Sequence, residues 1–271
     1  QRFPVSDIMI TTENQKIFEV CMWKINFDYK KDQWYGRLMI EFPFEDRTAW
    51  IVFPDEDKAT DRIAMKMEYW GAFPATEQRL VDEGYFLVFL TNKNRWGQDV
   101  DHDAKVRFID FMNREFGTRK KIVCVGMSCG GFHSVNFASR HPDYVSALYL
   151  DAPLLNMLSY PMGYGVGTQH LYVFDEEIAP AYGFTLSDLI NYRDMPYDRI
   201  HTLVENRIPV AMTAGDSDKI VPYVENGRYI EEAYRGTDIP FFLTIVPGRD
   251  HRPHGLEDPA PVIEFIRKYA L

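Results

Sequence analysis

Short apolar segments alternate with amphipathic segments along most of this chain, and that alternation limits the folds that it can adopt. Strand-like runs such as Tyr85–Thr91 and Lys121–Gly126 are each followed by a helical pattern, at about 101–116 and 129–140. Apolar runs of this kind are typical of strands that are buried on both faces, and strands separated by helices form parallel sheets. We therefore predict an α/β fold with a mostly parallel central sheet and helices on both faces.

The two ends of the chain and one internal segment complete this pattern. Further strand-like runs occupy residues 63–69, 145–150, 208–214 and 241–246, and further helices about 74–84, 223–235 and 259–269. Strands at about 17–29, 34–43 and 49–54 have short connections and would form an antiparallel edge. The segment at about 153–205, rich in Tyr, Gly and Pro, follows neither period. We predict one domain over residues 1–271, with an insertion that forms a small cap at about 153–205.

Composition excludes several classes of protein. The chain of 271 residues carries 30 Lys+Arg against 40 Asp+Glu, a net charge of −10, which speaks against general affinity for nucleic acid or for anionic membrane surfaces. Its three cysteines, Cys21, Cys124 and Cys129, cannot all pair and have no metal-binding spacing, so we expect no disulfide framework and no cysteine-based metal site. We also expect no metal and no cofactor. The start at Gln1, without Met or an apolar leader, slightly favours the cytoplasm but leaves a removed signal peptide open, and the oligomeric state stays open too.

The strongest motif is Gly126-Met127-Ser128-Cys129-Gly130, which fits the pattern Gly-x-Ser-x-Gly. A predicted strand precedes it and a predicted helix follows, so the serine would lie on a sharp turn that raises its hydroxyl above the sheet. Small residues at Gly126 and Gly130 would let strand and helix approach, and the N–H of Cys129 would point toward a reacting carbonyl oxygen. The alternative is a glycine-rich turn with an incidental serine. The context favours Ser128 as a nucleophile.

A serine hydroxyl is a weak nucleophile at neutral pH, so this hypothesis requires a histidine base and a carboxylate that orients it. The turn after the strand at 208–214 offers Asp216 and Asp218, and Asp151 ends the preceding strand. Asp218 is the preferred candidate because the chain turns back toward a helix directly after it. Asp216 suits a turn in which its side chain binds local backbone amides. Asp151 remains a third candidate.

Two histidines lie in the loop after the last predicted strand. His251 is our preferred base, because a loop lets the imidazole move between the nucleophile and the leaving group. His254 is the alternative base, or a residue that binds substrate or the loop itself. A metal site built from both histidines and Asp258 is a weaker alternative, because no other cluster of ligands supports it.

In chain order the candidates are Ser128, Asp218 and His251, which is the order found in α/β-hydrolases. From about residue 36 to the C-terminus the chain resembles the α/β-hydrolase superfamily. More narrowly, it resembles bacterial esterase-like members of the prolyl-oligopeptidase-like and carbohydrate-esterase-like kind. Those proteins carry a Gly-x-Ser-x-Gly-Gly elbow, a strand that ends in Asp-Ala-Pro, and a His-His-Pro-His loop leading to Asp-Pro. The corresponding residues here are 126–131, 151–153, 251–254 and 258–259.

Two positions depart from that pattern. Cys129 stands where a larger basic residue is usual, which would alter the pocket beside the nucleophile, and Arg252 replaces the second histidine, which removes one rival for the base. By the same resemblance, the segment 63–74 corresponds to the strand and loop that supply the second oxyanion donor. We expect the N–H of Tyr69 or Trp70 in that role, because this loop follows a strand and precedes a helix.

Several other side chains have less specific interpretations. Trp96 lies in the loop 92–98, where a mixture of aromatic and polar groups after a strand suits binding of a sugar or another polar substrate, although a solvated loop fits equally well. Trp70 has the same two possibilities, substrate contact or ordinary core packing. His133 is expected to pack on the helix after the elbow. The remaining histidines, including His102, are assigned to the surface by default.

These observations predict a serine hydrolase that cleaves a carboxylic ester through an acyl-enzyme. The absence of a long apolar lid speaks against a lipase, and loops rich in Tyr and Trp, together with the resemblance, favour a small acyl group such as acetyl on a carbohydrate. One alternative is a serine peptidase like prolyl oligopeptidase, disfavoured because this length holds no N-terminal propeller. The other is a non-catalytic binding protein with the hydrolase fold. The only partner we expect is a small-molecule ester, with no nucleic acid and no membrane.

Overall fold

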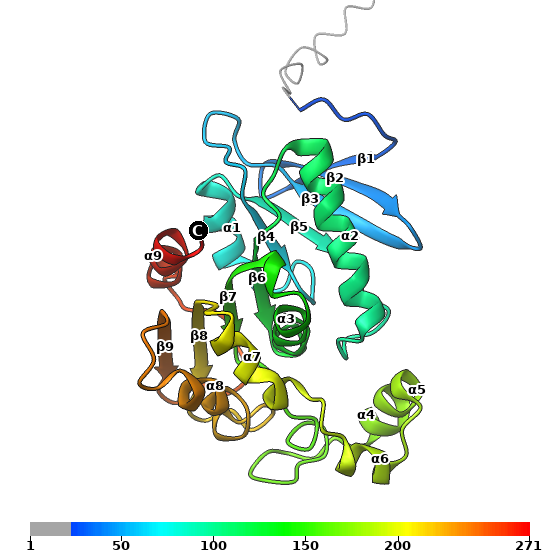
Figure 1. Cartoon of the computed structure of the whole chain (residues 1–271), viewed down its shortest axis with the longest axis vertical. Helices are drawn as coiled ribbons and strands as arrows, with labels where there is room; N and C mark the ends of the chain where they lie inside the picture. The colour runs from blue at the N-terminus through cyan, green and yellow to red at the C-terminus, as the bar shows by residue number, and fades with distance from the viewer. Residues whose placement is uncertain (1–22) are drawn as a thin grey trace, which may run out of the picture.

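A nine-stranded sheet runs through the part of the chain that the computed structural model describes, residues 23–271 (Figure 1). Its strands are β1 (Lys30–Trp34), β2 (Arg37–Phe44), β3 (Arg47–Val52), β4 (Ile63–Lys66), β5 (Phe86–Leu90), β6 (Ile122–Met127), β7 (Val145–Asp151), β8 (Val210–Gly215) and β9 (Phe241–Val246). In space they follow the order β1-β2-β3-β5-β4-β6-β7-β8-β9. From β1 to β5 neighbouring strands pair antiparallel, and from β5 across to β9 they pair parallel. The predicted α/β-hydrolase architecture, mostly parallel with antiparallel N-terminal strands, is confirmed.

Helices cover both faces of this sheet. They are α1 (Ala75–Asp82), α2 (Asp99–Phe116), α3 (Cys129–Arg140), α4 (Leu171–Val173), α5 (Ala179–Tyr182), α6 (Leu186–Asn191), α7 (Ile200–Glu205), α8 (Gly227–Tyr234) and α9 (Ala260–Tyr269), with shorter helical turns η1 (Pro142–Tyr144), η2 (Phe174–Ile178), η3 (Pro196–Arg199) and η4 (Tyr223–Glu225). Buried side chains of α2, α3, α7 and α8 form one apolar core against the sheet, and those of α1 and α9 contribute to the core on the opposite face. Figure 1 shows α1 and α9 together on one side of the strands.

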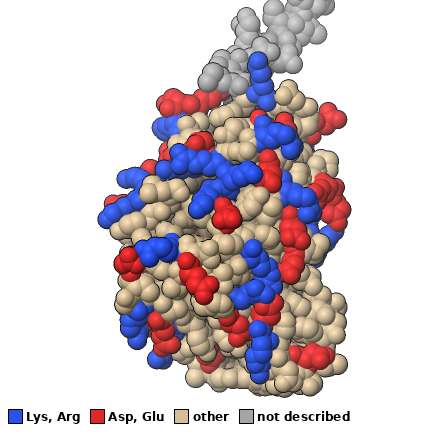
Figure 2. Space-filling model, viewed as in Figure 1, with Lys and Arg blue, Asp and Glu red and all other residues tan. Residues whose placement is uncertain are grey.

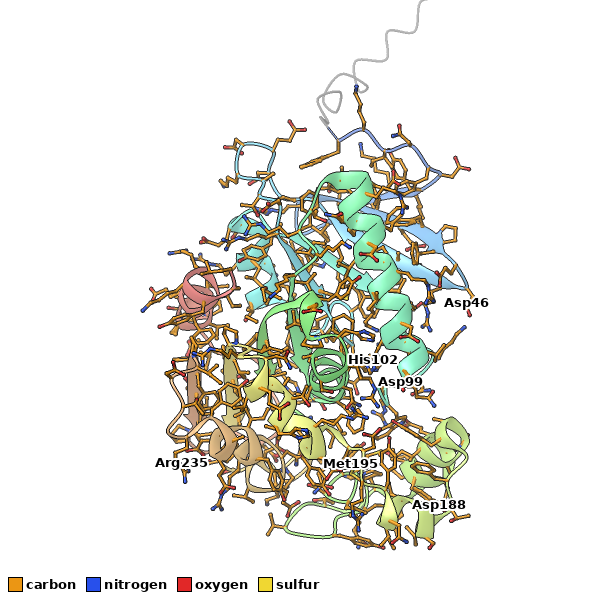
Figure 3. The ribbon with its side chains drawn as sticks, in the orientation of Figure 1. Asp46, Asp99, His102, Asp188, Met195 and Arg235 are labelled. Atoms are coloured by element: carbon orange, nitrogen blue, oxygen red, sulfur yellow. The ribbon has the colours of Figure 1, made fainter. Side chains whose placement is uncertain are left out.

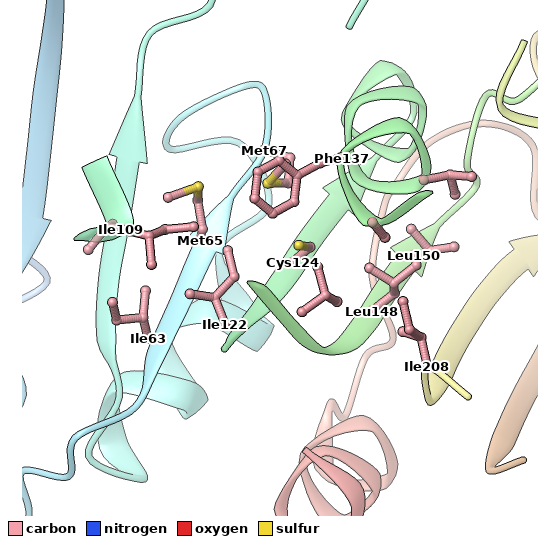
Figure 4. Close-up of a cluster of buried hydrophobic side chains, with 14 of the residues drawn as sticks. Ile63, Met65, Met67, Ile109, Ile122, Cys124, Phe137, Leu148, Leu150 and Ile208 are labelled. Atoms are coloured by element: carbon pink, nitrogen blue, oxygen red, sulfur yellow. The ribbon is translucent and has the colours of Figure 1, made fainter. Parts of the chain in front are cut away.

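The larger core explains why the central strands read as continuous apolar runs. Side chains from three adjacent strands and from two helices meet there, which removes them from water on a face that α2 and α3 cover (Figure 4). The strand residues are Ile63 and Met65 of β4, Ile122 and Cys124 of β6, and Leu148 and Leu150 of β7, and the helix residues include Ile109 and Phe137. This packing fixes the carboxyl ends of β6, β7 and β8 relative to one another, and the loops that follow them build the site.

The N-terminal prediction was wrong in one place. The expected strand at about 17–29 lies partly outside the described residues, as does Cys21, and residues 23–29 are not a strand. Trp23 and Phe27 instead pack on the edge of the core, and the first strand, β1, begins at Lys30. The aromatic residues that alternate with charged ones over residues 23–29 therefore pack on the core from an irregular segment. They do not belong to a hydrogen-bonded strand.

Residues 152–209 connect β7 to β8 and contain the short helical elements from α4 to α7. In Figure 1 the elements α4, α5 and α6 lie beyond the carboxyl ends of the strands, to one side of α3. Their buried side chains, including Val173, Ile178 and Leu189, form a third apolar cluster with residues of α3. This is the segment that we predicted as an insertion at about 153–205.

The surface and the helices bear on two broad properties of the molecule. On the face shown in Figure 2, acidic and basic side chains are intermixed over the sheet and α2. Within residues 23–271, no helix is both long enough and apolar enough to cross a membrane.

One histidine contradicts its default assignment to the surface. His102, which Figure 3 labels near the start of α2, is fully buried. Its ring meets that of His133 on α3 edge to face, with the centroids 5.6 Å apart. Burial lowers the pKa of both imidazoles well below their usual value. Both rings are therefore neutral packing groups at neutral pH.

Candidate active site

Ser128 lies between β6 and α3 with a backbone φ of 52°, the left-handed region that a residue with a side chain seldom adopts. Glycines make this turn possible. A Cβ on Gly126 would come within 2.5 Å of the Gly130 carbonyl oxygen, and one on Gly131 within 2.5 Å of Pro153. Gly130 itself has ordinary space, with the nearest atom 3.5 Å away, so Gly131 rather than Gly130 carries the close approach that we predicted.

The structure brings Ser128, Asp218 and His251 together in one hydrogen-bonded chain. His251 Nε2 lies 3.0 Å from Ser128 Oγ, and His251 Nδ1 lies 2.7 Å from Asp218 Oδ2. The other Asp218 oxygen accepts hydrogen bonds from the backbone N–H groups of Ile220 and Val221, at 2.9 and 2.8 Å. These bonds fix the carboxylate, so the imidazole is oriented with one nitrogen toward the acid and the other toward the hydroxyl.

Two neighbouring aspartates tie the acid loop to the histidine loop. Asp250 Oδ1 accepts hydrogen bonds from the N–H groups of Lys219 (3.1 Å) and His251 (2.7 Å). Asp216 Oδ1 accepts from the N–H of Gly248 at 2.7 Å. Asp216 thus binds a backbone amide in a turn, as its position suggested, and the carboxylate at the imidazole is that of Asp218. Together the two side chains hold the loops after β8 and β9 in register.

A second Asp–His pair lies beside the first. His254 Nδ1 is 2.7 Å from Asp151 Oδ2, which also accepts the N–H of Gly255 at 2.7 Å. The other Asp151 oxygen binds the hydroxyl of Thr213 and, at 3.3 Å, Nη2 of Arg249. Burial acts to raise the pKa of Asp151, but the hydrogen bonds from His254, Thr213 and Gly255 outweigh it and lower the pKa below its usual value. Asp151 is therefore an ionised anchor for the histidine loop.

A cavity of about 200 Å³ opens at Ser128 Oγ. Its wall consists of Tyr69, Ala72, Phe73, Arg95, Met127, Ser128, Cys129, Tyr160, Ile220, His251, Arg252 and His254. On the side of His251 it continues into a more open groove of about 390 Å³, lined by Tyr160, His170, Tyr172, Ile220, Asp250, His251 and Arg252. The nucleophile thus faces a small cavity whose histidine side leads to a wider, polar and aromatic groove.

Two of the predicted substrate contacts lie elsewhere. Trp96 is fully buried and absent from the wall of the cavity; its indole N–H donates to Glu177 at 3.1 Å, and its ring stacks on Tyr160. Trp70 belongs to an aromatic stack with Trp50, with the centroids 6.2 Å apart, and is also absent from the wall. Both tryptophans therefore pack against other side chains. Trp96 is covered by the segment that contains Tyr160 and Glu177, and Trp70 packs on Trp50 of β3.

Tyr69 does line the cavity, but through its side chain as well as its backbone. Its hydroxyl accepts a hydrogen bond from Arg95 Nη1 at 3.4 Å. Burial raises the pKa of this hydroxyl far above its usual value, so it remains a donor. The Tyr69 N–H donates to Glu68 Oε1 at 3.2 Å.

The Cys129 side chain is buried under the elbow. Burial raises the pKa of its thiol to about 11, although the nearby Arg95 charge acts in the opposite direction. The thiol is therefore neutral near pH 7. Because Cys129 is the first residue of α3, its backbone N–H has no carbonyl partner within the helix.

Three features of the site went unnoticed in the sequence. Arg95 and Tyr160 line the cavity, and Asp151 pairs with His254 rather than with the preferred base. Arg95 stands next to Trp96 in the loop 92–98. The composition of that loop therefore indicated the right segment, but Arg95 rather than Trp96 lines the cavity. Tyr160 lies in the irregular segment between β7 and β8, where no helical or strand period in the sequence indicates which side chains face the cavity.

The side chains required for the metal alternative have other partners. His251 and His254 bind different aspartates, and Asp258 accepts the N–H of Ala260 at 3.0 Å. Over residues 23–271, no group of three or more His, Cys, Asp or Glu side chains converges in a way that could hold a metal ion.

Comparison with known proteins places this geometry in a family. Residues 90–270, from the end of β5 to α9, match the model of the prolyl oligopeptidase family. The chain belongs to the prolyl oligopeptidase family. The members of this family are serine hydrolases, and the matched region contains Ser128, Asp218 and His251. No curated protein is similar enough in sequence to be matched with the chain.

Solved structures share the fold at low sequence identity. A Bacteroides ovatus protein assigned as a dipeptidyl aminopeptidase IV superposes with a TM-score of 0.62 at 13% identity, over 89% of this chain and 35% of that one. An acylaminoacyl peptidase from Pyrococcus horikoshii gives 0.59 at 15%, over 82% and 37%. An S-formylglutathione hydrolase from Agrobacterium tumefaciens gives 0.58 at 13%, over 83% and 93%. The chain thus spans about a third of the length of the two peptidases but most of that of the esterase.

Proposed function

We propose that this protein cleaves carboxylic esters through a serine acyl-enzyme. The observation that carries the proposal is the hydrogen-bonded chain from Asp218 through His251 to Ser128, with distances of 2.7 and 3.0 Å. His251 takes the proton from Ser128 as the oxygen attacks the ester carbonyl, and then donates it to the leaving alcohol. Water repeats the sequence and releases the acid, while Asp218 stabilises the imidazolium in both halves.

Backbone donors would hold the negative charge that develops on the carbonyl oxygen. The Cys129 N–H at the start of α3 is the first donor, aided by the positive end of the helix dipole. The second comes from the loop after β4, at Tyr69 or Trp70. Both N–H groups remain candidates: Tyr69 lines the cavity but its N–H donates to Glu68, and Trp70 is absent from the wall.

The shape of the site supports a small acyl group and a larger, polar alcohol. The leaving group must lie toward His251, which protonates it, and on that side the cavity widens into the groove with Tyr160, Tyr172 and Arg252. Aromatic rings and charged groups together suit the faces and hydroxyls of a sugar. The acyl group would then occupy the cavity of about 200 Å³ at Ser128, which suits a small group. We therefore propose an acetylated or similarly acylated carbohydrate as the substrate.

Peptide hydrolysis is the competing activity, because both the family and two of the structural neighbours carry the names of peptidases. The same residues would cleave an amide with His251 protonating an amine. Parallel assays with acetylated sugars and with aminoacyl-prolyl amides distinguish the two activities. Faster turnover of the esters, by kcat/KM and after correction for their higher intrinsic reactivity, supports the proposal, and the reverse order replaces it with a peptidase.

The nucleophile is tested by Ser128→Ala. We expect kcat with 4-nitrophenyl acetate to fall by at least about 10⁴-fold, since the acyl-enzyme cannot form. Ser187→Ala, an exposed serine in α6, is the matched control and should keep full activity. Equal rates for Ser128→Ala and the parent would show that another group is the nucleophile. If the parent fails to react with a fluorophosphonate, the fold serves binding rather than catalysis.

A further inference from the structure

The loop after β4 has a backbone conformation that needs support from the rest of the protein. Residues 67–73, here called the oxyanion loop because they contain the proposed second donor, line the cavity at Ser128 through Tyr69, Ala72 and Phe73. The backbone φ of Tyr69 is 59° and that of Phe73 is 48°, in the left-handed region that is unfavourable for residues with side chains. Contacts outside the loop therefore decide where its N–H groups point.

The start of the oxyanion loop is held from the face of the sheet that α2 covers. Asn92 Nδ2 donates to the Met67 carbonyl oxygen at 2.8 Å and to Glu68 Oε2 at 2.5 Å, and Glu68 Oε1 accepts the Tyr69 N–H at 3.2 Å. Lys105 Nζ, in α2, donates to Asn92 Oδ1. An ammonium can only donate, so this contact turns the amide oxygen toward Lys105 and the amide nitrogen toward the loop. A chain of hydrogen bonds thus runs from Lys105 to the backbone of Tyr69.

Burial of Lys105 is unfavourable in itself. Its side chain is fully buried, and burial lowers its pKa to about 8, although the charges of Asp101 and Glu68 act in the opposite direction. Its direct hydrogen-bond partner is the neutral amide of Asn92. A buried ammonium in such a place stabilises a fold less than an apolar side chain of similar size. Stability therefore does not account for Lys105, whereas the orientation of Asn92 does.

The end of the oxyanion loop is held from the opposite face of the sheet. Lys66, the last residue of β4, is buried and forms an ion pair with the buried Glu77 of α1. Side chains alternate along a strand, so Lys66 points toward α1 while its neighbour Met65 belongs to the core under α2. Lys66 Nζ also donates to the Ala72 carbonyl oxygen at 3.3 Å. The ion pair thus fixes a donor behind a residue that lines the cavity.

We propose that Lys66 and Lys105 are positioning residues, which hold the oxyanion loop in the conformation that directs its backbone N–H toward the carbonyl oxygen of the substrate. The proposal rests on the ester hydrolysis proposed above. Both lysines are absent from the wall of the cavity at Ser128, so each acts through the loop and not by contact with the substrate. Loss of either side chain should therefore weaken stabilisation of the transition state more than binding of the ground state.

The contact on the α2 side is tested by Lys105→Met. With a misdirected donor, kcat for 4-nitrophenyl acetate should fall by about 30-fold, while KM changes by less than about twofold. A trifluoromethyl ketone reports on the oxyanion directly, because Ser128 Oγ adds to its carbonyl carbon, His251 takes the proton and the carbonyl oxygen becomes the oxyanion. Its inhibition constant should rise by the same factor as kcat falls. Lys268→Met, at an exposed lysine in α9, is the matched control and should keep the parent values.

The contact on the α1 side is tested by the double variant Lys66→Met/Glu77→Met, which replaces the whole ion pair by apolar side chains of similar length. Removal of a buried pair in this way should leave the midpoint of urea unfolding at or above that of the parent. Despite the intact fold, kcat should fall by about tenfold with KM nearly unchanged, and the inhibition constant of the ketone should rise by the same factor. This variant separates positioning from stability even if Lys105→Met does not fold.

Three results would decide against the proposal. A variant whose kcat stays within about twofold of the parent overturns the role of the lysine that it replaces and leaves ester hydrolysis standing. A lower unfolding midpoint in the double variant, with an unchanged inhibition constant for the ketone, would assign the lysines to stability alone. A parent that does not cleave 4-nitrophenyl acetate overturns ester hydrolysis together with the positioning roles.

Discussion

Two Asp–His pairs lie side by side at the carboxyl edge of the sheet, and only one of them reaches a serine. In both pairs the imidazole Nδ1 is 2.7 Å from a carboxylate oxygen, and the two rings meet edge to face with their centroids 4.7 Å apart. His251 extends this contact to Ser128 Oγ at 3.0 Å, whereas the ring of His254 packs against Phe73. The residue types alone therefore do not distinguish a base from a structural histidine.

The partners of the two carboxylates explain the difference. Asp218 accepts two backbone N–H groups besides His251. Asp151 binds Arg249 as well as His254, so a fixed cation already compensates its charge. We infer that the Asp218 pair serves proton transfer and that the Asp151 pair fixes the loop that carries His251.

The two histidines give the largest expected contrast. His251→Ala should lower kcat for 4-nitrophenyl acetate by about 10⁴-fold or more, because no other base is within reach of Ser128 Oγ in the described hydrogen-bond network. His254→Ala should lower kcat by less than about tenfold, since it removes a hydrogen bond to Asp151 and packing contacts but leaves the contact of His251 with Ser128 in place. Similar losses in the two variants would mean that the pairs share the catalytic task.

The two aspartates should separate catalysis from stability. Asp218→Asn should reduce kcat by about 10⁴-fold through the wrong imidazole tautomer while the fold stays intact. Asp151→Asn should instead lower the free energy of unfolding by about 3 kcal/mol, because it leaves Arg249 and His254 without their buried partner.

Urea unfolding and steady-state kinetics on the same preparations measure both effects. Asp143→Asn, at an exposed position, is the control for replacing a carboxylate by an amide. A stable but inactive Asp151→Asn, with kcat as low as that of Asp218→Asn, would reverse the assignment.

A smaller effect concerns pH. The pKa of Asp151 is lowered in the folded chain, so its ionised form stabilises the fold at every pH above the unfolded value of about 3.9. That contribution is lost as the pH falls through the lowered folded value. The stability difference between the parent and Asp151→Asn should therefore be constant above about pH 5 and shrink below about pH 4. A difference that grew on acidification would contradict the anchoring role.

The comparison also shows where sequence reasoning succeeds. The elbow could be predicted because its constraints are local: glycines at 126 and 131 make room for a turn that the strand and helix on either side define. The order of Ser128, Asp218 and His251 followed from where strands end. Parallel strands of a sheet bring their carboxyl ends to one edge, so residues far apart in the chain were expected to meet there.

The remaining features depended on contacts that no local pattern encodes. Asp151 and His254 are 103 positions apart, and their pairing follows from how the loop after β9 folds back over β7. The aromatic and polar groups of the loop 92–98 suited either substrate binding or a solvated loop for Trp96. Its side chain is instead fully buried, and its indole N–H donates to Glu177 from the segment 152–209. Glu177 also binds the guanidinium of Arg95, and Arg95 rather than Trp96 lines the cavity.

The roles of Ser128 and His251 are tested most directly by the rate at which a fluorophosphonate labels the protein, with the modified residue located by mass spectrometry. We expect a single adduct on Ser128, formed at least about 10³-fold more slowly in His251→Ala and at close to the parent rate in His254→Ala. An adduct on another serine, or a rate that depends on His254 rather than on His251, would contradict these roles.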